Sequence, residues 1–464
     1  MIRIHDTLTN GLRELVPRDA GKVSIYACGP TVYSRIHVGN ARPYVVFALL
    51  KRFLEHEGFD VTFVANITDV NDKIYDAARE RGVHSDELAR EMTATYRRDT
   101  DRLELGRPDH EPLASETIDG IVELIQALID SGHAYASQGD VYFSVRNFPE
   151  YGKLSNRRLE DLAAQDTGEP EEEAQLKRDP LDFALWKAQK EGEDTAWDAP
   201  WGRGRPGWHV ECSAMAEGIL GLGFDIHGGG IDLVFPHHEN EIAQTEAARN
   251  LPLARHWMHN GMVRFGDEKM AKSVGNIRLL SDVLDEYGRD VLIMYFLGGR
   301  YGKPLAFSEE ELEQAQRSLE RVRNFCRLLR RSAPPRGEGE ADRFVTDQKE
   351  KFFEALRDDF NTPSALAALF ELVAEGNRRL EAGDQIPGIG DAFAEMLQVI
   401  GLENLLEAEE PVEEEAGRLA EERERARSEG DFERADALRH ELAERGYEVR
   451  DTDDGPVLVR SSRS

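Results

Sequence analysis

Residues 23–66 place a strand, a helix and a second strand in immediate succession, and this pattern restricts the fold more than any other part of the chain. The segment begins with VSIYAC and ends with VTFVAN, two short apolar runs of the kind found in buried strands. Between them, apolar residues recur at helical spacing from about Val45 to Leu54, and Gly58 ends the helix. A unit of this kind predicts a nucleotide-binding parallel sheet, so we expect an α/β protein of Rossmann type.

Polar residues follow both predicted strands, at the ends where open parallel sheets bind their ligands. His37, Gly39 and Asn40 lie where the first strand leads into the helix. Backbone N–H groups, an imidazole and an amide at that place suit phosphate oxygens. The simpler alternative is a turn glycine beside a surface histidine. After the second strand, Thr68 and Asp69 either meet a ligand or cap the next helix, and both interpretations stay open.

The stretch 208–241 contains side chains that suit a transition metal. Cys212, His237 and Glu241 are three candidate ligands, and Cys28 is a fourth from far upstream. His237 and Glu241 are four residues apart, so a helix would place them on one face. A thiolate, an imidazole and a carboxylate together suit zinc. Because these residues are spread along the chain, they favour a functional metal site over a zinc finger, in which the cysteines come in close pairs. The alternative is that the cysteines are small buried apolar residues.

Two further segments carry candidate nucleotide contacts. In FDIHGGGID, the first four residues predict a strand and the glycines a turn, with Gly229, Gly230 and Asp232 near a ribose. Farther on, a glycine-containing loop carries Lys269 and Lys272, whose ammonium groups could neutralise a pyrophosphate leaving group. The alternative for both lysines is an ordinary solvated loop.

Composition limits the class of protein. The formal net charge of −31 excludes a simple basic coat for nucleic acid, although local basic patches can still bind phosphates. The chain contains three cysteines, at 28, 212 and 326, which make no disulfide framework and fit a reducing compartment. We find no signal peptide and no apolar run long enough to cross a membrane. We therefore expect a cytoplasmic protein with no membrane contact.

Shifts in pattern along the chain predict five parts. The segment between the two halves of the sheet domain contains its own strand and an acidic, poorly patterned loop, and we interpret it as an insertion. The expected parts are the first half of the sheet domain (1–117), a connective insertion (118–205), the second half of the sheet domain (206–300), a helical-bundle domain (301–400) and a small C-terminal α+β module (401–464).

Several blocks resemble a known family. HVGN at 37–40 resembles the first signature of class I aminoacyl-tRNA synthetases, and KMAKS at 269–273 resembles the second, with Ala271 in place of the usual serine. The following blocks together, in this order, resemble cysteinyl-tRNA synthetases: CGPTVY, NITDVNDK, GRPGWHVECSAM, FDIHGGGIDLVFPHHENEIAQ, DDFNTPSALAAL and ARSEGDFERADALRHEL. The resemblance runs from the first residues to about residue 460, and ordered blocks are far more specific than one motif.

The resemblance implies a reaction and a set of sites. Cysteine and ATP, with magnesium, would give cysteinyl-adenylate and pyrophosphate, and the cysteinyl group would then move to the 3′ end of tRNA(Cys). One zinc ion per subunit would be held by Cys28, Cys212, His237 and Glu241. The implied catalytic residues are His37, Asn40, Lys269 and Lys272. ATP contacts would add Gly39, Gly229, Gly230 and Asp232, and the cysteine pocket Thr68, Trp208 and His227.

The resemblance also implies partners. The C-terminal module would read the anticodon, and a monomer is favoured over a stable oligomer. Two rival functions stay open: the cysteine ligase of mycothiol synthesis, which acylates an amino sugar, and a catalytically silent tRNA-binding paralogue. The amino-sugar ligase lacks an anticodon module, whereas this chain carries a tail that resembles one. The presence of both ATP signatures disfavours the silent paralogue.

Overall fold

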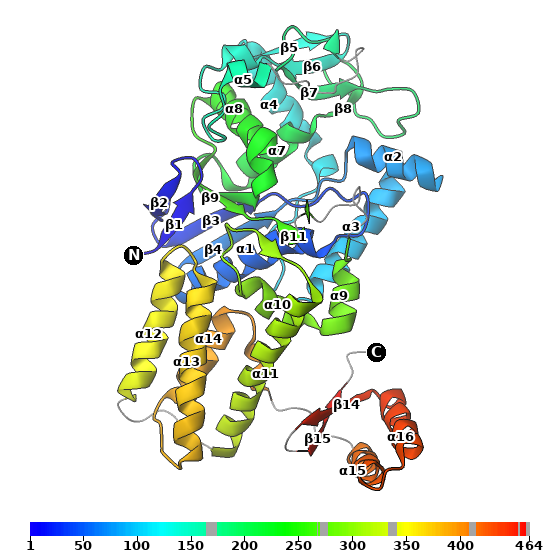
Figure 1. Ribbon diagram of the computed structural model, residues 1–464. Helices are drawn as coiled ribbons and strands as arrows, with labels where there is room; N and C mark the ends of the chain where they lie inside the picture. Colours follow the sequence, from blue (N-terminus) through cyan, green and yellow to red (C-terminus); the bar gives the residue numbers. More distant parts are fainter. Residues whose placement is uncertain are drawn as a thin grey trace.

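The computed structural model describes residues 1–163, 174–266, 268–269, 277–332, 341–407, 414–452 and 455–460. A parallel sheet occupies the middle of the molecule, with the insertion on one side of it and helices on the other (Figure 1). A small helical and two-stranded module lies at the carboxyl end. This arrangement confirms the predicted α/β class, with a Rossmann-type catalytic domain, an insertion, a helical part and a C-terminal α+β module. None of the described helices is both long and apolar enough to span a bilayer.

Strands from two distant parts of the chain form the central sheet. Its order is β10-β9-β3-β4 and every neighbouring pair is parallel. The strands are β3 (Lys22–Ala27), β4 (Asp60–Ala65), β9 (Phe224–Gly230) and β10 (Ala254–Asn260). Because all four run the same way, their carboxyl ends meet at one edge, and this edge carries the functional site.

Helix α1 (Val38–His56) connects β3 to β4 and begins well before its apolar pattern does. The early turns face the ligand edge of the sheet and carry small or polar residues, which explains why hydrophobic spacing did not reveal them. From Tyr44 to Leu54 most side chains are buried.

The three glycines after His227 do not form the predicted turn, because β9 continues through them to Gly230. A close approach of α1 explains the difference. A Cβ atom on Gly228 would lie 1.9 Å from the ring of Phe47, so the strand can pass α1 only with glycine at this position. The turn follows at η3 (Ile231–Leu233) and the π-helical η4 (Val234–His238).

The remaining elements of the first catalytic half frame the sheet. They are β1 (Arg3–Asp6), β2 (Gly11–Glu14), α2 (Asp72–Arg81), α3 (Ser85–Asp101) and η1 (Ala114–Glu116).

The insertion is built on an antiparallel sheet of order β5-β6-β7-β8 with a separate apolar core. Its elements are α4 (Ile118–Asp130), β5 (Ala134–Ser137), β6 (Asp140–Phe143), η2 (Val145–Asn147), α5 (Leu159–Ala163), β7 (Phe183–Ala188) and β8 (Gly204–Pro206). The chain returns from β8 directly into α7 (Trp208–Leu220), so the insertion abuts the site.

One continuous core joins one face of the sheet to the later elements of the second catalytic half and to the helical part. Their elements are α8 (Glu239–Arg249), β11 (Val263–Phe265), β12 (Glu268–Lys269), α9 (Leu280–Tyr287), α10 (Arg289–Leu297), β13 (Leu305–Ala306), α11 (Glu309–Ser332), α12 (Arg343–Arg357), α13 (Thr362–Glu381), α14 (Ile389–Val399) and η6 (Glu403–Leu406). Leu402 and Leu405 still belong to this core.

The C-terminal module has a small core of its own, centred on Leu419, Leu442 and Tyr447. It consists of α15 (Glu414–Ser428), α16 (Phe432–Glu444), β14 (Tyr447–Thr452) and β15 (Gly455–Arg460), whose two strands pair in antiparallel fashion.

Candidate active site

The four candidate metal ligands meet at the edge of the sheet. One ligand atom from each of Cys28, Cys212, His237 and Glu241 lies within 4.8 Å of the others. Cys28 follows the end of β3, Cys212 is in α7, and the other two lie on either side of the junction between η4 and α8. The site is thus assembled by three separate segments of the fold.

The distances within this cluster leave room for an ion of zinc's size. His237 Nε2 lies 3.1 Å from Glu241 Oε1, which confirms that the four-residue spacing brings them together. Cys28 Sγ lies 3.6 Å from His237 Nε2 and 3.5 Å from Glu241 Oε1. Zinc bonds to sulfur and nitrogen ligands are about 2.0–2.3 Å long, so tetrahedral ligand atoms lie about 3.3–3.8 Å apart, close to the separations of these three atoms.

Neighbouring histidines hold two of the ligands in place. His227 Nε2 lies 2.8 Å from Glu241 Oε2, which leaves Oε1 to face the cluster. His209 Nδ1 lies 3.0 Å from His237 Nδ1, which leaves Nε2 of His237 to face it. Contacts of this kind fix the orientation of metal ligands in proteins.

Sequence reasoning did not identify His238 as part of the site. Cys28, His227, His238 and Glu241 form a second set of ligand atoms within 4.8 Å of one another. His238 Nε2 is 3.3 Å from Cys28 Sγ, and its Nδ1 is 2.7 Å from His259 Nε2. The two sets share Cys28 and Glu241, so they describe one place. The signal in the sequence was the density of histidines in IHGGG, PHHENE and MHNG.

Burial favours the neutral forms of the thiols and imidazoles in the cluster. Burial raises the pKa of the Cys28 thiol well above its usual value, and the nearby Cys212 and Glu241 raise it further. Burial lowers the pKa of His237 and of His209 to about 3. Neutral imidazoles are ready to bind a cation, and a bound divalent cation would stabilise the thiolates that burial alone disfavours.

A cavity of about 400 Å³ opens beside the cluster. Trp208 is part of its wall, and the indole ring stacks on the imidazole of His237 with the ring centres 4.4 Å apart. The predicted site residues that line this cavity are Cys28, His37, Gly39, Asn40, Trp208, Gly230 and Asp232. Of the four candidate metal ligands, Cys28 therefore shares one cavity with the first signature.

The first signature forms the start of α1. His37 is the N-cap residue, and its backbone N–H donates to Asn40 Oδ1 at 3.2 Å. A Cβ atom on Gly39 would lie 2.9 Å from the imidazole of His37, so glycine lets that ring lie close to the helix. The helix N-terminus faces the cavity and suits an anionic ligand.

Three residues that were predicted to contact cysteine or ATP do not line the cavity. Thr68 and His227 are buried and do not line the cavity, and Gly229 packs against Leu233 and His238. Thr68 Oγ1 is 3.3 Å from Asn66 Nδ2, while Asn66 Oδ1 accepts from the N–H of Gly29 at 2.9 Å. Asn66 thus links Thr68 to the residue beside Cys28.

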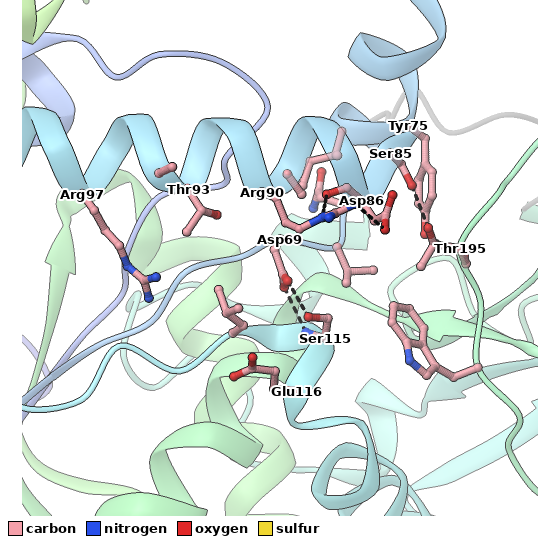
Figure 2. Close-up of a pocket in the computed structure, with 17 residues that line it drawn as sticks. Asp69, Tyr75, Ser85, Asp86, Arg90, Thr93, Arg97, Ser115, Glu116 and Thr195 are labelled. Atoms are coloured by element: carbon pink, nitrogen blue, oxygen red, sulfur yellow. Dashed lines mark hydrogen bonds and ion pairs between the residues drawn. The ribbon is translucent and has the colours of Figure 1, made fainter. Parts of the chain in front are cut away.

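Contacts of the residues after β4 exclude the helix-capping interpretation, and those of Asp69 lie in a second cavity. Figure 2 shows Asp69 pointing at Ser115, whose N–H and hydroxyl donate to it at 2.9 and 2.5 Å. Asn71, not Thr68 or Asp69, caps α2. This cavity of about 520 Å³ shares no lining residue with the one beside the cluster, and we assign Asp69 an anchoring role.

The second signature falls largely outside the described residues. Lys272 and Ala271 are not described, and Lys269 is described only as the last residue of the short strand β12. Their predicted contacts with ATP therefore stay predictions.

Comparisons with known proteins show which family the chain is similar to. The chain matches the family described as "tRNA synthetases class I (C) catalytic domain" over residues 14–317, the "DALR domain" over 351–404 and the "Cysteinyl-tRNA ligase anticodon binding domain" over 411–456. A protein named cysteine–tRNA ligase from Carboxydothermus hydrogenoformans is 45% identical over 463 residues, which are 98% of this chain and 99% of that protein. One from Halorhodospira halophila is 45% identical over 99% of this chain and 100% of its own.

A solved structure shows a similar fold. Methionyl-tRNA synthetase of Mycobacterium tuberculosis, in complex with methionyl-adenylate, superposes with a TM-score of 0.61 over 83% of this chain and 88% of its own. Sequence identity is 17%, so this likeness concerns the fold alone.

Proposed function

Because this chain belongs to the cysteinyl-tRNA synthetases, which are class I aminoacyl-tRNA synthetases, we propose that it joins L-cysteine to tRNA(Cys) in two steps and selects cysteine with one zinc ion. The observation that carries the proposal is the cluster of Cys28, Cys212, His237 and Glu241, of which Cys28 lines the same cavity as the first signature. An amino acid bound by its side chain at the cluster would present its carboxylate to that cavity.

The donor set explains how cysteine is told from serine. The two amino acids have nearly the same shape, and a pocket that relies on shape discriminates poorly between them. Zinc bound by Cys28, Cys212, His237 and Glu241 would supply a soft Lewis acid that prefers a thiolate to a hydroxyl. His227 and His209 would keep the carboxylate and imidazole ligands oriented during selection. A second, editing site is not needed on this account.

The first signature and the lysines would act on ATP. The helix N-terminus, with His37 and Asn40, would bind the phosphates, and Gly230 and Asp232 would border the nucleoside end of the cavity. Lys269 and Lys272 would neutralise the charge that develops on the leaving pyrophosphate. Activation then depends on position and electrostatics, with no covalent enzyme intermediate.

The remaining parts would bind the RNA. The module at residues 414–460 would read the anticodon, while the helical part would contact the stem. We propose that the protein works as a cytoplasmic monomer. If the acceptor of the cysteinyl group were an amino sugar, this module would have no RNA to bind.

The deciding experiment is charging of a deacylated tRNA pool with labelled cysteine, in the presence of ATP and zinc and with serine as competitor. Serine-resistant cysteinyl-tRNA is the expected result. If exchange between ATP and pyrophosphate depended on cysteine but no tRNA were charged, the acceptor would be a different one, such as an amino sugar. If neither activity appeared in zinc-loaded protein, the silent paralogue would be the better description.

A further inference from the structure

A further cavity, of about 220 Å³, lies where the insertion meets the starts of α2 and α7, and we call it the insertion cavity. Trp208 is part of its wall and also of the wall of the cavity beside the cluster. Asn71 and Asp72 line the insertion cavity, whereas the next residue, Lys73, lines the cavity beside the cluster. The two cavities therefore adjoin one another at Trp208 and at the first turn of α2.

The insertion cavity carries more cationic than anionic side chains. Lys177, Lys187 and Arg205 contribute positive charge, and Asp72 is the one carboxylate among its described lining residues. The whole chain, in contrast, has a formal net charge of −31. His209 in the same wall adds no charge at neutral pH, because burial lowers its pKa to about 3. The lining therefore suits an anionic ligand.

Arg205 is a fixed part of this wall. Its guanidinium donates to Asp72 and, at 3.2 and 3.3 Å, to Glu193, and its side chain is 3% exposed. These contacts join β8 of the insertion to α2, which lies beside it (Figure 1). Because two carboxylates face Arg205, this residue shapes the cavity, and the lysines are the groups that can attract a ligand.

The two lysines are less enclosed than the arginine. Lys187 Nζ donates to Asp72 Oδ2 at 3.1 Å, and its side chain is 22% exposed. Lys177 Nζ lies 6.0 Å from the centre of the Tyr142 ring, which belongs to the same wall. An ammonium group has three N–H donors, so a lysine that donates to one neighbour can donate to a ligand as well.

The size and charge of the insertion cavity favour a phosphodiester over the triphosphate of ATP. A phosphodiester carries a single negative charge, and a lysine binds phosphate as a point charge without demanding one geometry. The volume is also smaller than the 400 Å³ of the cavity at the first signature. An RNA strand with a phosphate here would place the next ribose past Trp208, beside an amino acid bound at the cluster.

We propose that Lys177 and Lys187 bind a phosphodiester in the single-stranded 3′ end of tRNA and thereby guide its terminal ribose into the cavity beside the cluster. The proposal rests on the proposed function, because it takes tRNA as the acceptor. No bond forms or breaks in the insertion cavity. The contacts are electrostatic, so binding through them should weaken as the salt concentration rises.

The test compares intact tRNA(Cys) with the same tRNA lacking its single-stranded 3′ end. We expect Lys177→Ala and Lys187→Ala each to weaken binding of intact tRNA by roughly 10-fold, as the loss of one hydrogen bond to a charged group does. The slope of log Kd against log salt should become shallower by about 0.7 for each lysine removed, the value for single strands. Binding of the shortened tRNA should not change, and Lys187→Arg, which keeps the charge, should bind intact tRNA as the unaltered protein does.

The matched control is Lys153→Ala. Lys153 also lies in the insertion and pairs with Glu150 at 2.8 Å and with Glu246, but it does not line the insertion cavity. This variant should bind both RNAs as the unaltered protein does.

Three results would overturn the proposal. The alanine variants could bind intact tRNA as tightly as the unaltered protein, or they could lose affinity for both RNAs equally, which would place the lysines against the stem. They could also raise the KM for ATP in cysteine-dependent exchange, which would make the insertion cavity a site for the phosphates of ATP. Failure of the proposed function is read separately, because the unaltered protein would then charge no tRNA.

Discussion

The ligand cluster and the C-terminal module are built in opposite ways. In the cluster, Cys212, His237 and Glu241 are each at most 1% exposed and are held by contacts between segments far apart in sequence. The module has its own small core and stands apart from the catalytic domain (Figure 1). On the proposed function, amino-acid selection would depend on a buried site, while RNA recognition would belong to a separable part. Cysteine activation and tRNA charging should respond differently to changes in the two regions.

The largest effect should come from removing a thiol of the cluster. We expect Cys212→Ser to abolish stoichiometric zinc binding and to lower both ATP–pyrophosphate exchange and charging by roughly 10³-fold, the upper range for loss of one group that stabilises charge in an active site. Zinc content by atomic absorption and both assays would be measured. Cys326→Ser is the control, because Cys326 is equally buried but lies in α11, in the core of the helical part. Full zinc content in Cys212→Ser would contradict the proposed ligand set.

A lysine of the second signature should give the next largest effect. We expect Lys272→Ala to lower the kcat of exchange by roughly 10²-fold, because a charge that stabilises the leaving group is lost from the transition state. The KM for ATP should change far less, and zinc content should not change. Lys349→Ala is the control, since Lys349 pairs with Glu395 in the helical part. Equal changes in kcat and KM would assign Lys272 to ground-state binding.

Removal of the C-terminal module should separate the two activities. The truncation is best placed after Glu407, because Leu402 and Leu405 pack in the main core and Arg330 donates to the carbonyls of Leu405 and Glu407. We expect exchange to be unchanged, whereas kcat/KM for tRNA should fall by roughly 10²-fold, as expected when one of two linked binding surfaces is lost. Undiminished charging would refute the assignment of this module to tRNA.

The sequence predicted the parts of this comparison that depend on local pattern or motif. The strands at β3 and β4 were visible as apolar runs, and the four candidate ligands followed from residue chemistry together with the family resemblance. Contacts between distant segments were not visible. The continuation of β9 through its glycines depends on Phe47 of α1, and the anchoring of Asp69 depends on Ser115. Likewise, nothing in the pattern indicated that Arg205 would reach Asp72 and Glu193.

The smallest effect should come from changing the carboxylate of the cluster. This change tests whether the four candidate ligands contribute equally to zinc binding. Two protein thiolates, a substrate thiolate and a carboxylate would place more negative charge on zinc than it requires, so we expect Glu241 to be the weakest ligand. Its Oε2 is already held by His227 at 2.8 Å, and Glu241→Gln keeps an oxygen and the shape of the side chain. We expect the variant to retain most of its zinc and to lose roughly 10-fold in exchange, the range for a change in the groups that orient a metal ligand. Metal analysis beside Cys212→Ser decides the matter: a loss of zinc as complete as in the serine variant would show that the carboxylate is an equal ligand and that all four side chains act as one unit.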